Sequence, residues 1–335
     1  MNYKKINLAI VGATGLVGST FLKVLEEKSY IQIENLYLFA SQKSAGKTTI
    51  FRNKKYVVEE LTKDNIKNKK IDYALFSAGG EISKKFAPIF AKNNTIVIDN
   101  SSYFRMDKNV PLIVPQVNAE KIFSHKNIIA NPNCSTIECM APLKALDNIF
   151  DLKEIVFSTY QAVSGSGMKG LQDLKENKQG KQSKFYPYDI YENCLPHIDK
   201  FLDNGFTKEE MKMVNETQKI LCKKIKISAT CVRVPISYCH SVSIYAKFKK
   251  EIDVNLARKA LKDFNGIVLL DDTQNNIYPM PVIAKNTDSV YVGRVRKDLF
   301  CKKAISMFVC ADNIRKGAAS NAIEILEEIL KTKNI

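Results

Sequence analysis

The 335-residue sequence lacks a long hydrophobic segment. A transmembrane helix needs roughly 18 consecutive apolar residues, and no stretch of this chain approaches that length. The chain leads from Lys4 and Lys5 directly into a strand-like segment, 6–11, without the apolar core and cleavage site of a signal peptide. We therefore expect a cytoplasmic protein that has no membrane partner.

Cysteines and histidines are too dispersed to predict a metal site or a disulfide framework. None of the eight cysteines forms a Cys-x-x-Cys pair, and the chain has only three histidines. Most of the cysteines are expected to be small buried hydrophobic residues.

Arginine is scarce although the chain is strongly basic. Only seven of the 51 basic residues are arginine, and the net charge is +16. The charges form no aromatic-interleaved stripe and no recognition motif, so nucleic acid is not predicted as a partner. A positive field instead attracts anionic substrates. Because lysine is used almost everywhere, each arginine is a candidate for a position that needs a planar, bidentate guanidinium.

The order of predicted elements indicates an α/β protein with two domains. In the first part, strands alternate with helices, a pattern typical of a parallel sheet. After about residue 133, longer alternating strands favour an antiparallel sheet with one covered face. We predict a Rossmann-type dinucleotide-binding domain, 1–132, and an α+β catalytic and dimerisation domain, 133–312, with a mostly antiparallel sheet. The predicted strands are 6–11, 36–40, 71–76, 95–99, 155–162, 226–234 and 241–249, and the main helices are 19–28, 83–92, 135–149 and 314–331.

A glycine-rich turn follows the first predicted strand. Its pattern, Gly12-x-x-Gly15-x-x-Gly18, differs by one position from the usual dinucleotide fingerprint. Glycine permits a tight turn and a close approach of backbone N–H groups to a pyrophosphate at a helix N-terminus. The candidate cofactor-binding residues in this turn are Gly12, Thr14, Gly15, Leu16, Val17 and Gly18.

The end of the second predicted strand favours NADP over NAD. An NAD site usually has an acidic residue there, to bind the ribose 2′-hydroxyl. This chain has Ser41, Lys43 and Ser44 instead, and these side chains suit a 2′-phosphate. The alternative is an ordinary polar loop.

Cys134 lies where a strand ends, an Asn-Pro turn follows and a helix begins. The positive end of a helix dipole favours the thiolate form of such a cysteine. Backbone N–H groups and the Asn133 side chain are candidates for an oxyanion pocket. The alternative is a buried cysteine that opens a core helix. Together with a nucleotide-binding domain, however, the pattern predicts aldehyde oxidation through a thioester.

Several segments resemble the aspartate-semialdehyde dehydrogenases. They span almost the whole chain in the order of that family, and they are residues 100–107, 131–136, 160–165, 231–235, 240–241 and 312–319. The resemblance implies that Cys134 attacks the aldehyde, that hydride passes to NADP, and that phosphate releases β-aspartyl phosphate. The biosynthetic direction is the reverse, in the aspartate pathway to lysine, threonine, methionine and isoleucine. The family also implies a homodimer formed through the second domain.

The same resemblance assigns further residues. His240 would be the general acid and base, although its position in a strand also fits a core histidine. Gln161 would orient the acyl oxygen. For the substrate, Arg105 and Lys219 would bind the phosphate, Arg233 the α-carboxylate and Glu216 the amine, with Asn100 also in the substrate site. On the nicotinamide side the residues would be Ser164, Gly165 and Asn321, because a C-terminal helix, 313–335, returns to the cofactor domain.

Other protein families share some of these sequence features. N-acetyl-γ-glutamyl-phosphate reductase and glyceraldehyde-3-phosphate dehydrogenase also use thioester chemistry, but neither explains segments 131–136 and 231–235 together. An N-acetylated substrate would leave Glu216 without an ammonium group. A non-enzymatic nucleotide sensor or scaffold would not need Cys134, Gln161, Arg233 and His240 together.

Overall fold

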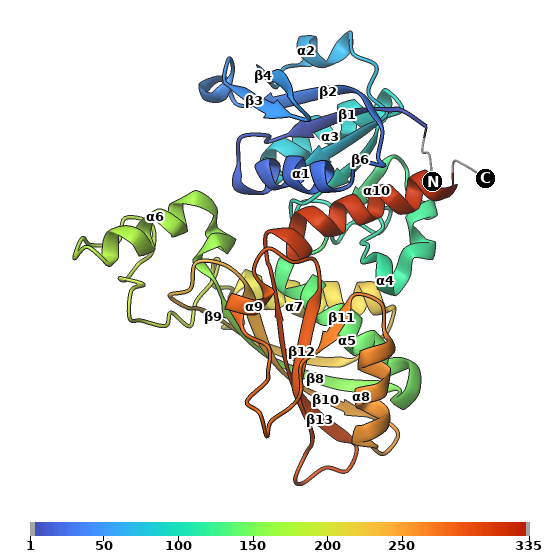
Figure 1. The fold of residues 1–335 in the computed structure, drawn as a ribbon, viewed down its shortest axis with the longest axis vertical. Helices are drawn as coiled ribbons and strands as arrows, with labels where there is room; N and C mark the ends of the chain where they lie inside the picture. Colours follow the sequence, from blue (N-terminus) through green and yellow to red (C-terminus); the bar gives the residue numbers. More distant parts are fainter. Residues whose placement is uncertain (1–3, 333–335) are drawn as a thin grey trace. The chain divides into compact units, whose positions relative to one another are not determined.

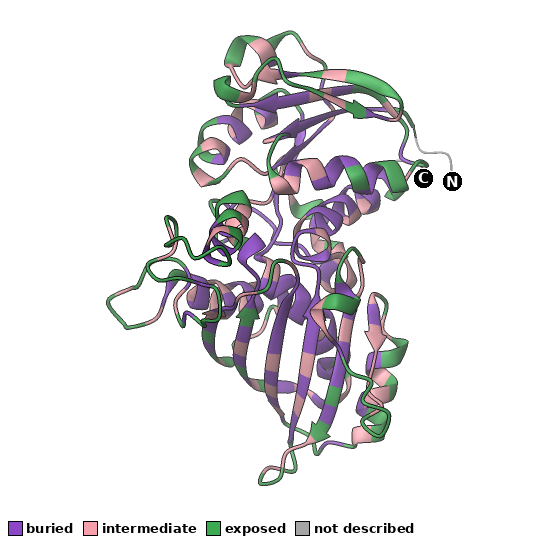
Figure 2. Ribbon diagram, turned by 60° about the vertical axis from the view of Figure 1, so that its left-hand side comes forward, coloured by how far each residue is buried: buried purple, intermediate pink, exposed green. Residues whose placement is uncertain are grey.

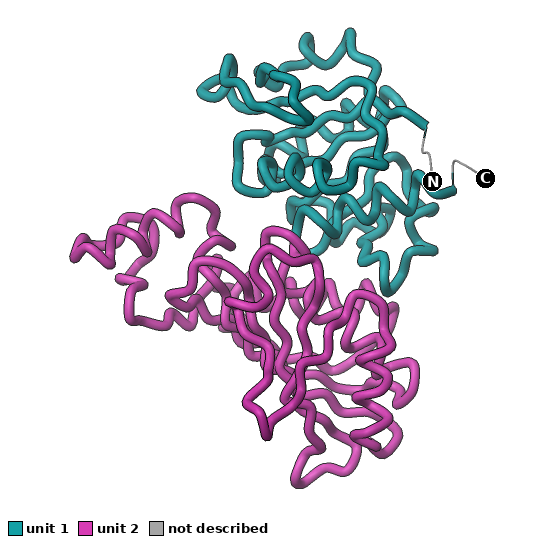
Figure 3. The backbone as a smooth tube through the Cα atoms, viewed as in Figure 1, with its two compact units in different colours: residues 1–132, 318–335 teal, residues 133–317 magenta. Residues whose placement is uncertain are grey.

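The computed structural model describes residues 4–332, which fall into two compact units (Figure 3). Unit 1 comprises residues 1–132 and 318–335, and unit 2 comprises residues 133–317. The predicted second boundary lay near residue 313, five residues before the chain enters unit 1 again. Within the described range, no helix is both long and apolar enough to cross a bilayer.

Unit 1 is a doubly wound sheet (Figure 1). Its strand order is β3-β4-β2-β1-β5-β6-β7, and every neighbouring pair is parallel except β3–β4. Without β3 this is the Rossmann order, in which ligands bind beside the central first strand. The strands are β1 (Ile6–Val11), β2 (Ile33–Ala40), β3 (Thr48–Phe51), β4 (Lys54–Glu60), β5 (Tyr73–Phe76), β6 (Ile96–Asp99) and β7 (Ile128–Ala130).

The helices of unit 1 bury apolar faces against this sheet. Helix α1 contributes Phe21, Val24 and Leu25 to the core, which also contains residues of the C-terminal helix α10. The helical segments are α1 (Leu16–Glu27), η1 (Gln42–Ser44), α2 (Lys63–Lys67), α3 (Gly80–Lys92), α4 (Pro115–Asn118), η2 (Ala119–Ser124) and α10 (Asn321–Thr332). A π-helical segment, η4 (Arg315–Ser320), precedes α10. The helix predicted over 314–331 is therefore present, but its first part is π-helical.

Unit 2 contains a six-stranded sheet in the order β11-β12-β13-β10-β8-β9. The three central pairs are antiparallel, whereas β11–β12 and β8–β9 are parallel, which confirms the predicted mostly antiparallel sheet. The strands are β8 (Leu152–Gln161), β9 (Lys226–Arg233), β10 (His240–Phe248), β11 (Ile267–Leu269), β12 (Val290–Lys297) and β13 (Ala304–Ala311).

Helices cover one face of the unit 2 sheet. They are α5 (Cys134–Phe150), α7 (Lys208–Leu221) and α8 (Val254–Asp263). All three pack on strands of the sheet, and α7 and α8 also pack on α5. Buried and less buried residues alternate along the strands, as expected when one face is covered (Figure 2). The remaining helical segments are η3 (Val163–Ser166), α6 (Gly167–Asn177) and α9 (Pro281–Ala284).

Glycine is required at two places in the turn between β1 and α1. Gly12 has a φ of 87°, and a Cβ atom there would lie 2.9 Å from the carbonyl carbon of Ser77. A Cβ atom at Gly18 would lie only 2.1 Å from the carbonyl oxygen of Gly12. The missing side chains therefore let α1 pack directly against the turn.

We predict that Gly18→Ala destabilises the protein by about 1–3 kcal/mol, because the methyl group forces the backbone of the turn to move. Thermal unfolding of the purified variant measures this loss. Gly80→Ala is the matched control, since a Cβ atom there meets nothing closer than 3.8 Å. Equal melting temperatures for the two variants would contradict the packing argument.

Candidate active site

Three predicted site residues of unit 2 lie at the same edge of its sheet. Gln161 ends β8 and pairs with Arg233, which ends the parallel strand β9. His240 begins β10, which runs antiparallel to β8 and therefore starts where β8 ends. All three side chains are buried. The strand topology thus brings together residues that are far apart in the sequence.

Cys134 is the first residue of α5, which packs on β8, β10 and β13. The Asn133 side chain caps this helix, because its Oδ1 atom accepts hydrogen bonds from the backbone N–H groups of Ser135 (3.0 Å) and Thr136 (3.4 Å). Cys134 itself is half-buried. The predicted arrangement, a thiol at the positive end of a helix, is therefore present in the structure.

Burial distinguishes the other cysteines from Cys134. Burial raises the pKa of Cys231 to about 12 and that of Cys310 to about 12, so both remain thiols at neutral pH. Cys139 and Cys239 are buried as well. The expectation of small buried residues is wrong for Cys194 and Cys222, which are exposed.

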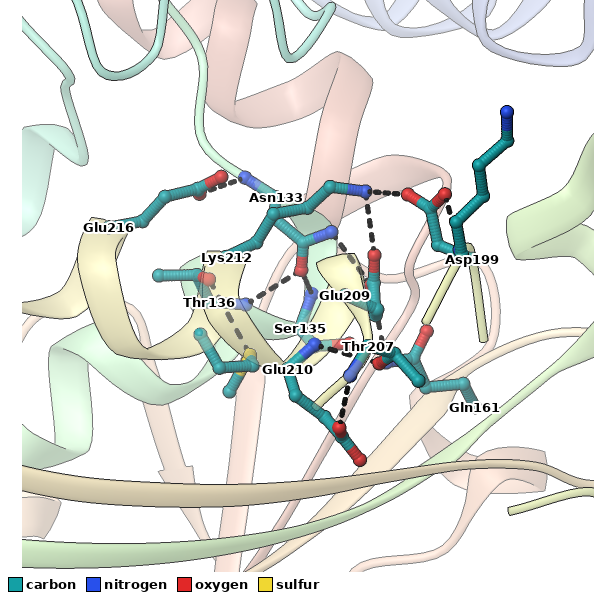
Figure 4. A network of polar contacts seen from close by, with 12 residues as sticks. Asn133, Ser135, Thr136, Gln161, Asp199, Thr207, Glu209, Glu210, Lys212 and Glu216 are labelled. Carbon is teal, nitrogen blue, oxygen red and sulfur yellow. Dashed lines mark hydrogen bonds and ion pairs between the residues drawn. The ribbon is translucent and has the colours of Figure 1, made fainter. Parts of the chain in front are cut away.

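A buried carboxylate on α7, Glu209, holds Asn133 and Gln161 in place (Figure 4). It accepts hydrogen bonds from Asn133 Nδ2 at 2.9 Å and Gln161 Nε2 at 3.3 Å, and it forms an ion pair with Lys212 at 2.9 Å. Lys212 also pairs with Asp199 at 2.9 Å. Burial opposes the ionisation of Glu209, but Lys212, Asn133 and Arg233 together lower its pKa.

Glu209 was not among the site residues predicted from the sequence. A helix start was recognisable, because Thr207 and Glu210 form a capping box at the beginning of α7. The spacing of Glu209 and Lys212 also fits an ion pair along one helix face. Neither pattern indicates that the carboxylate reaches Asn133, which lies 76 residues earlier.

Glu216 and Lys219 lie on the same helix, α7. The Glu216 carboxylate is buried and accepts a hydrogen bond of 2.7 Å from the Asn133 backbone N–H group. Lys219, one turn later, is half-buried. The roles assigned to them, amine binding and phosphate binding, stay predictions.

His240 presents a hydrogen-bond donor at one edge of its ring. The Ala162 backbone N–H group donates to His240 Nδ1 at 3.0 Å, so the hydrogen-bond pattern places the proton of the neutral ring on Nε2. Burial, reinforced by the Arg233 charge, lowers the pKa of His240 well below its ordinary value. No atom in the described part of the chain accepts from Nε2. His240 is therefore not a fully satisfied core histidine.

Arg233 and Gly165 lie beside His240. Arg233 Nη1 donates to the carbonyl oxygen of Ala162 at 2.6 Å, whereas Arg233 Nε has no hydrogen-bond partner among residues 4–332. A Cβ atom at Gly165 would lie 2.9 Å from Arg233 Nη1 and 3.2 Å from His240 Nε2. Gly165 thus keeps the space in front of these two side chains open, while Ser164 is buried and donates to Asn313.

In unit 1, two predicted substrate-binding residues form a local group. Arg105 is buried, and it donates from Nε to the Asn131 carbonyl oxygen at 2.9 Å and from Nη2 to the Asn100 carbonyl oxygen at 2.7 Å. Both side-chain amide atoms of Asn100 are buried without a hydrogen-bond partner in the described range. The structure therefore places Arg105 and Asn100 together.

The predicted cofactor residues lie at the expected strand ends of unit 1. Gly15 precedes α1 and provides no side-chain cap, which leaves the first N–H groups of the helix without a side-chain acceptor from that position. Ser41, Lys43 and Ser44 follow β2, and the first two are exposed. Asn321 is buried; its Nδ2 donates to Ile113 and Asn131, and its Oδ1 has no partner among the described residues.

Residues 7–125 match the NAD-binding domain of semialdehyde dehydrogenases, and residues 142–316 match the dimerisation domain of the same enzymes. The aspartate-semialdehyde dehydrogenase of Aquifex aeolicus is 52% identical over 334 residues, covering 97% of this chain and 98% of the relative. The chain belongs to the aspartate-semialdehyde dehydrogenase family.

Solved structures of this family superpose on the chain. The Vibrio cholerae aspartate semialdehyde dehydrogenase II, described as complexed with ASA, has a TM-score of 0.92 and 41% identity, with 98% and 99% of the two chains covered. The Candida albicans enzyme, solved with NADP, has a TM-score of 0.78 and 26% identity, with 98% and 99% covered. The expected family and its two-domain fold are thereby confirmed.

We predict that Glu209→Gln lowers the free energy of unfolding by about 3 kcal/mol at neutral pH, because it breaks a buried ion pair. Folding lowers the pKa of Glu209, so its stabilising contribution is present above the ordinary glutamate value of about 4.3 and is lost as the pH falls through the lowered value. Urea denaturation at neutral and acidic pH measures the difference from the wild type.

The exposed Glu34 provides the control, since Glu34→Gln should change stability by less than about 0.5 kcal/mol. A difference between Glu209→Gln and the wild type that stays constant down to strongly acidic pH would contradict the ion-pair account.

Proposed function

We propose that the chain catalyses the reversible, NADPH-dependent reduction of β-aspartyl phosphate to aspartate semialdehyde and phosphate through a thioester on Cys134. The observation that carries the proposal is the arrangement in unit 2. Cys134 opens a capped helix that packs on β8 and β10, and the edge of this sheet presents Gln161, Arg233 and His240. Relatives named aspartate-semialdehyde dehydrogenase match almost the full length of the chain.

In the oxidative direction, the Cys134 thiolate attacks the aldehyde carbon and the carbonyl oxygen becomes an oxyanion. The Nε2–H group of His240 is available to donate a hydrogen bond to this oxygen, which is the acid half of the role predicted for His240. Gln161, held by Glu209, would orient the same acyl group. The proposed function does not require a metal.

Bound NADP would supply the acceptor for the hydride of the tetrahedral carbon. Phosphate then attacks the thioester, a new C–O bond forms, and the C–S bond breaks to return the Cys134 thiolate. The helix start that favours the attacking thiolate also favours its departure, because the same charge develops on sulfur.

Substrate recognition would use both arginines. The Nε atom of Arg233 is buried without a hydrogen-bond partner in the described residues, so it is available to donate to a substrate carboxylate. Glu216 would bind the amine. Arg105 in unit 1 and Lys219 in unit 2 would bind the phosphate, and Asn100 would also belong to the substrate site. Asn133, whose Nδ2 donates to Glu209, would stabilise the oxyanion.

For the cofactor, the residues of unit 1 fit NADP. The turn at Gly12 and Gly18 has no room for side chains, and the uncapped start of α1 suits a pyrophosphate. Asn321 Oδ1 is an acceptor for the nicotinamide carboxamide, and Lys43 carries the charge that a 2′-phosphate needs. In unit 2, Ser164 and Gly165 would face the nicotinamide.

We also propose a homodimer formed through the open face of the unit 2 sheet. This face presents the exposed side chains of Val156 and Tyr160, and the Tyr160 ring lies 6.2 Å from that of Phe308. An apolar patch on a sheet face that no helix of the described residues covers fits a second copy of the domain, and the family assigns dimerisation to this domain.

Turnover is the direct test of this function. Purified enzyme with aspartate semialdehyde, NADP and phosphate should form NADPH, and NADPH formation should require phosphate. Cys134→Ala should lower the rate by at least about 10³-fold, because the covalent path is lost.

N-acetylglutamate semialdehyde is the control substrate and should not react. Turnover of the acetylated substrate alone would assign the chain to the competing reductase, and no turnover of either substrate would contradict the enzymatic proposal.

Lys43 tests the cofactor preference. Lys43→Glu should raise the KM for NADP at least about tenfold, because the new carboxylate repels the 2′-phosphate, whereas the KM for NAD should change much less. Steady-state kinetics with both cofactors measures the ratio. An equal change for NADP and NAD would show that Lys43 does not contact the 2′-phosphate.

A further inference from the structure

A buried carboxyl group, Glu138, lies one helical turn after Cys134 in α5. Residues four apart share a helix face, and side chains lean toward the helix N-terminus, so Glu138 points back toward the turn of Cys134. Gly317 marks the place where the two meet. A Cβ atom on Gly317 would lie 2.9 Å from Cys134 Cβ and 3.3 Å from Glu138 Oε1.

In the described part of the chain, no hydrogen-bond donor stabilises a negative charge on Glu138. The residue is fully buried, and neither carboxyl oxygen has a hydrogen-bond partner within the described chain. The charged group that acts on it is another carboxylate, Asp312, after β13. The thiols of Cys239, just before β10, and of Cys310, in β13, also lie close enough to interact with it. An ionised carboxylate in these surroundings would cost several kcal/mol.

The carboxyl group is therefore neutral and carries a proton. Burial, together with Asp312, raises the pKa of Glu138 well above its ordinary value, which agrees with the geometry. A neutral carboxylic acid is a hydrogen-bond donor as well as an acceptor.

Glu138 is also a poor choice for stability alone. A buried polar group without a partner lowers the stability of the folded state, and an apolar side chain of the same length would fill the space at no such cost. Such departures from the packing rules are typical of functional positions.

We propose that Glu138 is a positioning residue for the nucleophile: once the thiolate forms, the neutral carboxyl group, which has no hydrogen-bond partner among the described residues, turns to donate a hydrogen bond to the sulfur of Cys134 and stabilises the thiolate there. The inference rests on the proposed role of Cys134. No proton is transferred: the O–H bond stays on Glu138 and the negative charge stays on sulfur. The acylated sulfur is a weaker acceptor, so the hydrogen bond favours the return of the thiolate when the C–S bond breaks.

Glutamine and methionine form a matched pair for the test. Both have about the length of glutamate and neither carries a charge, but only glutamine donates a hydrogen bond. The readout is the rate at which iodoacetamide alkylates Cys134 in the full-length protein at neutral pH, followed by mass spectrometry of the peptide. This measurement needs neither substrate nor cofactor, so it stands even if the wild type shows no turnover.

Glu138→Met should slow the alkylation of Cys134 about tenfold, the effect of one hydrogen bond to a charged group, while Glu138→Gln should stay close to the wild-type rate. Glu138→Met should also lower kcat while the KM for the aldehyde stays the same, and it should melt no lower than the wild type.

Equal alkylation rates for all three proteins would overturn the proposal. Slow alkylation of Glu138→Gln would also overturn it, because the carboxyl group would then act as something other than a neutral donor. A methionine variant that is unstable or unfolded would contradict it as well, since Glu138 would then be needed for folding.

Discussion

The active site depends on how the start of α5 is held. Asn133 caps the helix through Ser135 and Thr136, and it donates to two carboxylates of α7, from Nδ2 to Glu209 and from its backbone N–H group to Glu216. These contacts fix the first turn of α5, and with it the position of Cys134. Because the cap satisfies orphan N–H groups in a buried place, its loss would leave unpaired donors next to the nucleophile.

Two consequences follow from this anchored helix. Glu209 on α7 accepts hydrogen bonds from both Asn133 and Gln161. The residue before Cys134 and one residue of the sheet edge are therefore held by the same carboxylate. Glu138 also lies near this turn, because a Cβ atom on Gly317 would lie 2.9 Å from Cys134 Cβ and 3.3 Å from Glu138 Oε1. Two carboxyl groups near Cys134 thus differ in their surroundings: Glu209 is paired with Lys212, whereas Glu138 has no hydrogen-bond partner among the described residues.

Much of this organisation could be predicted from the sequence, because it depends on local rules. The glycine spacing fixes the β1–α1 turn, and the Asn-Pro-Asn segment before Cys134 marks a helix start. The long alternating strands predicted β9 and β10 within one residue and β8 within three. The shared edge of Gln161, Arg233 and His240 follows only from strand order, which periodicity does not reveal.

The features that were missed depend on long-range contacts. Strands β3, β4, β11, β12 and β13 were not predicted, and β3 and β4 meet at a turn where Arg52 and Asn53 adopt positive φ angles. The contact of Glu209 with Asn133 spans 76 residues, and the lack of partners around Glu138 is visible only once the fold is known. The reactive residues of the site could therefore be predicted from the sequence, whereas the long-range contacts that position them could not.

The central claim is that Cys134 carries the acyl group. Enzyme mixed with aspartate semialdehyde and NADP without phosphate, then quenched in acid, should carry one aspartyl adduct, and peptide mass spectrometry should place it on Cys134. Phosphate added before the quench should remove the adduct. An adduct on another cysteine, or turnover without any adduct, would contradict the account.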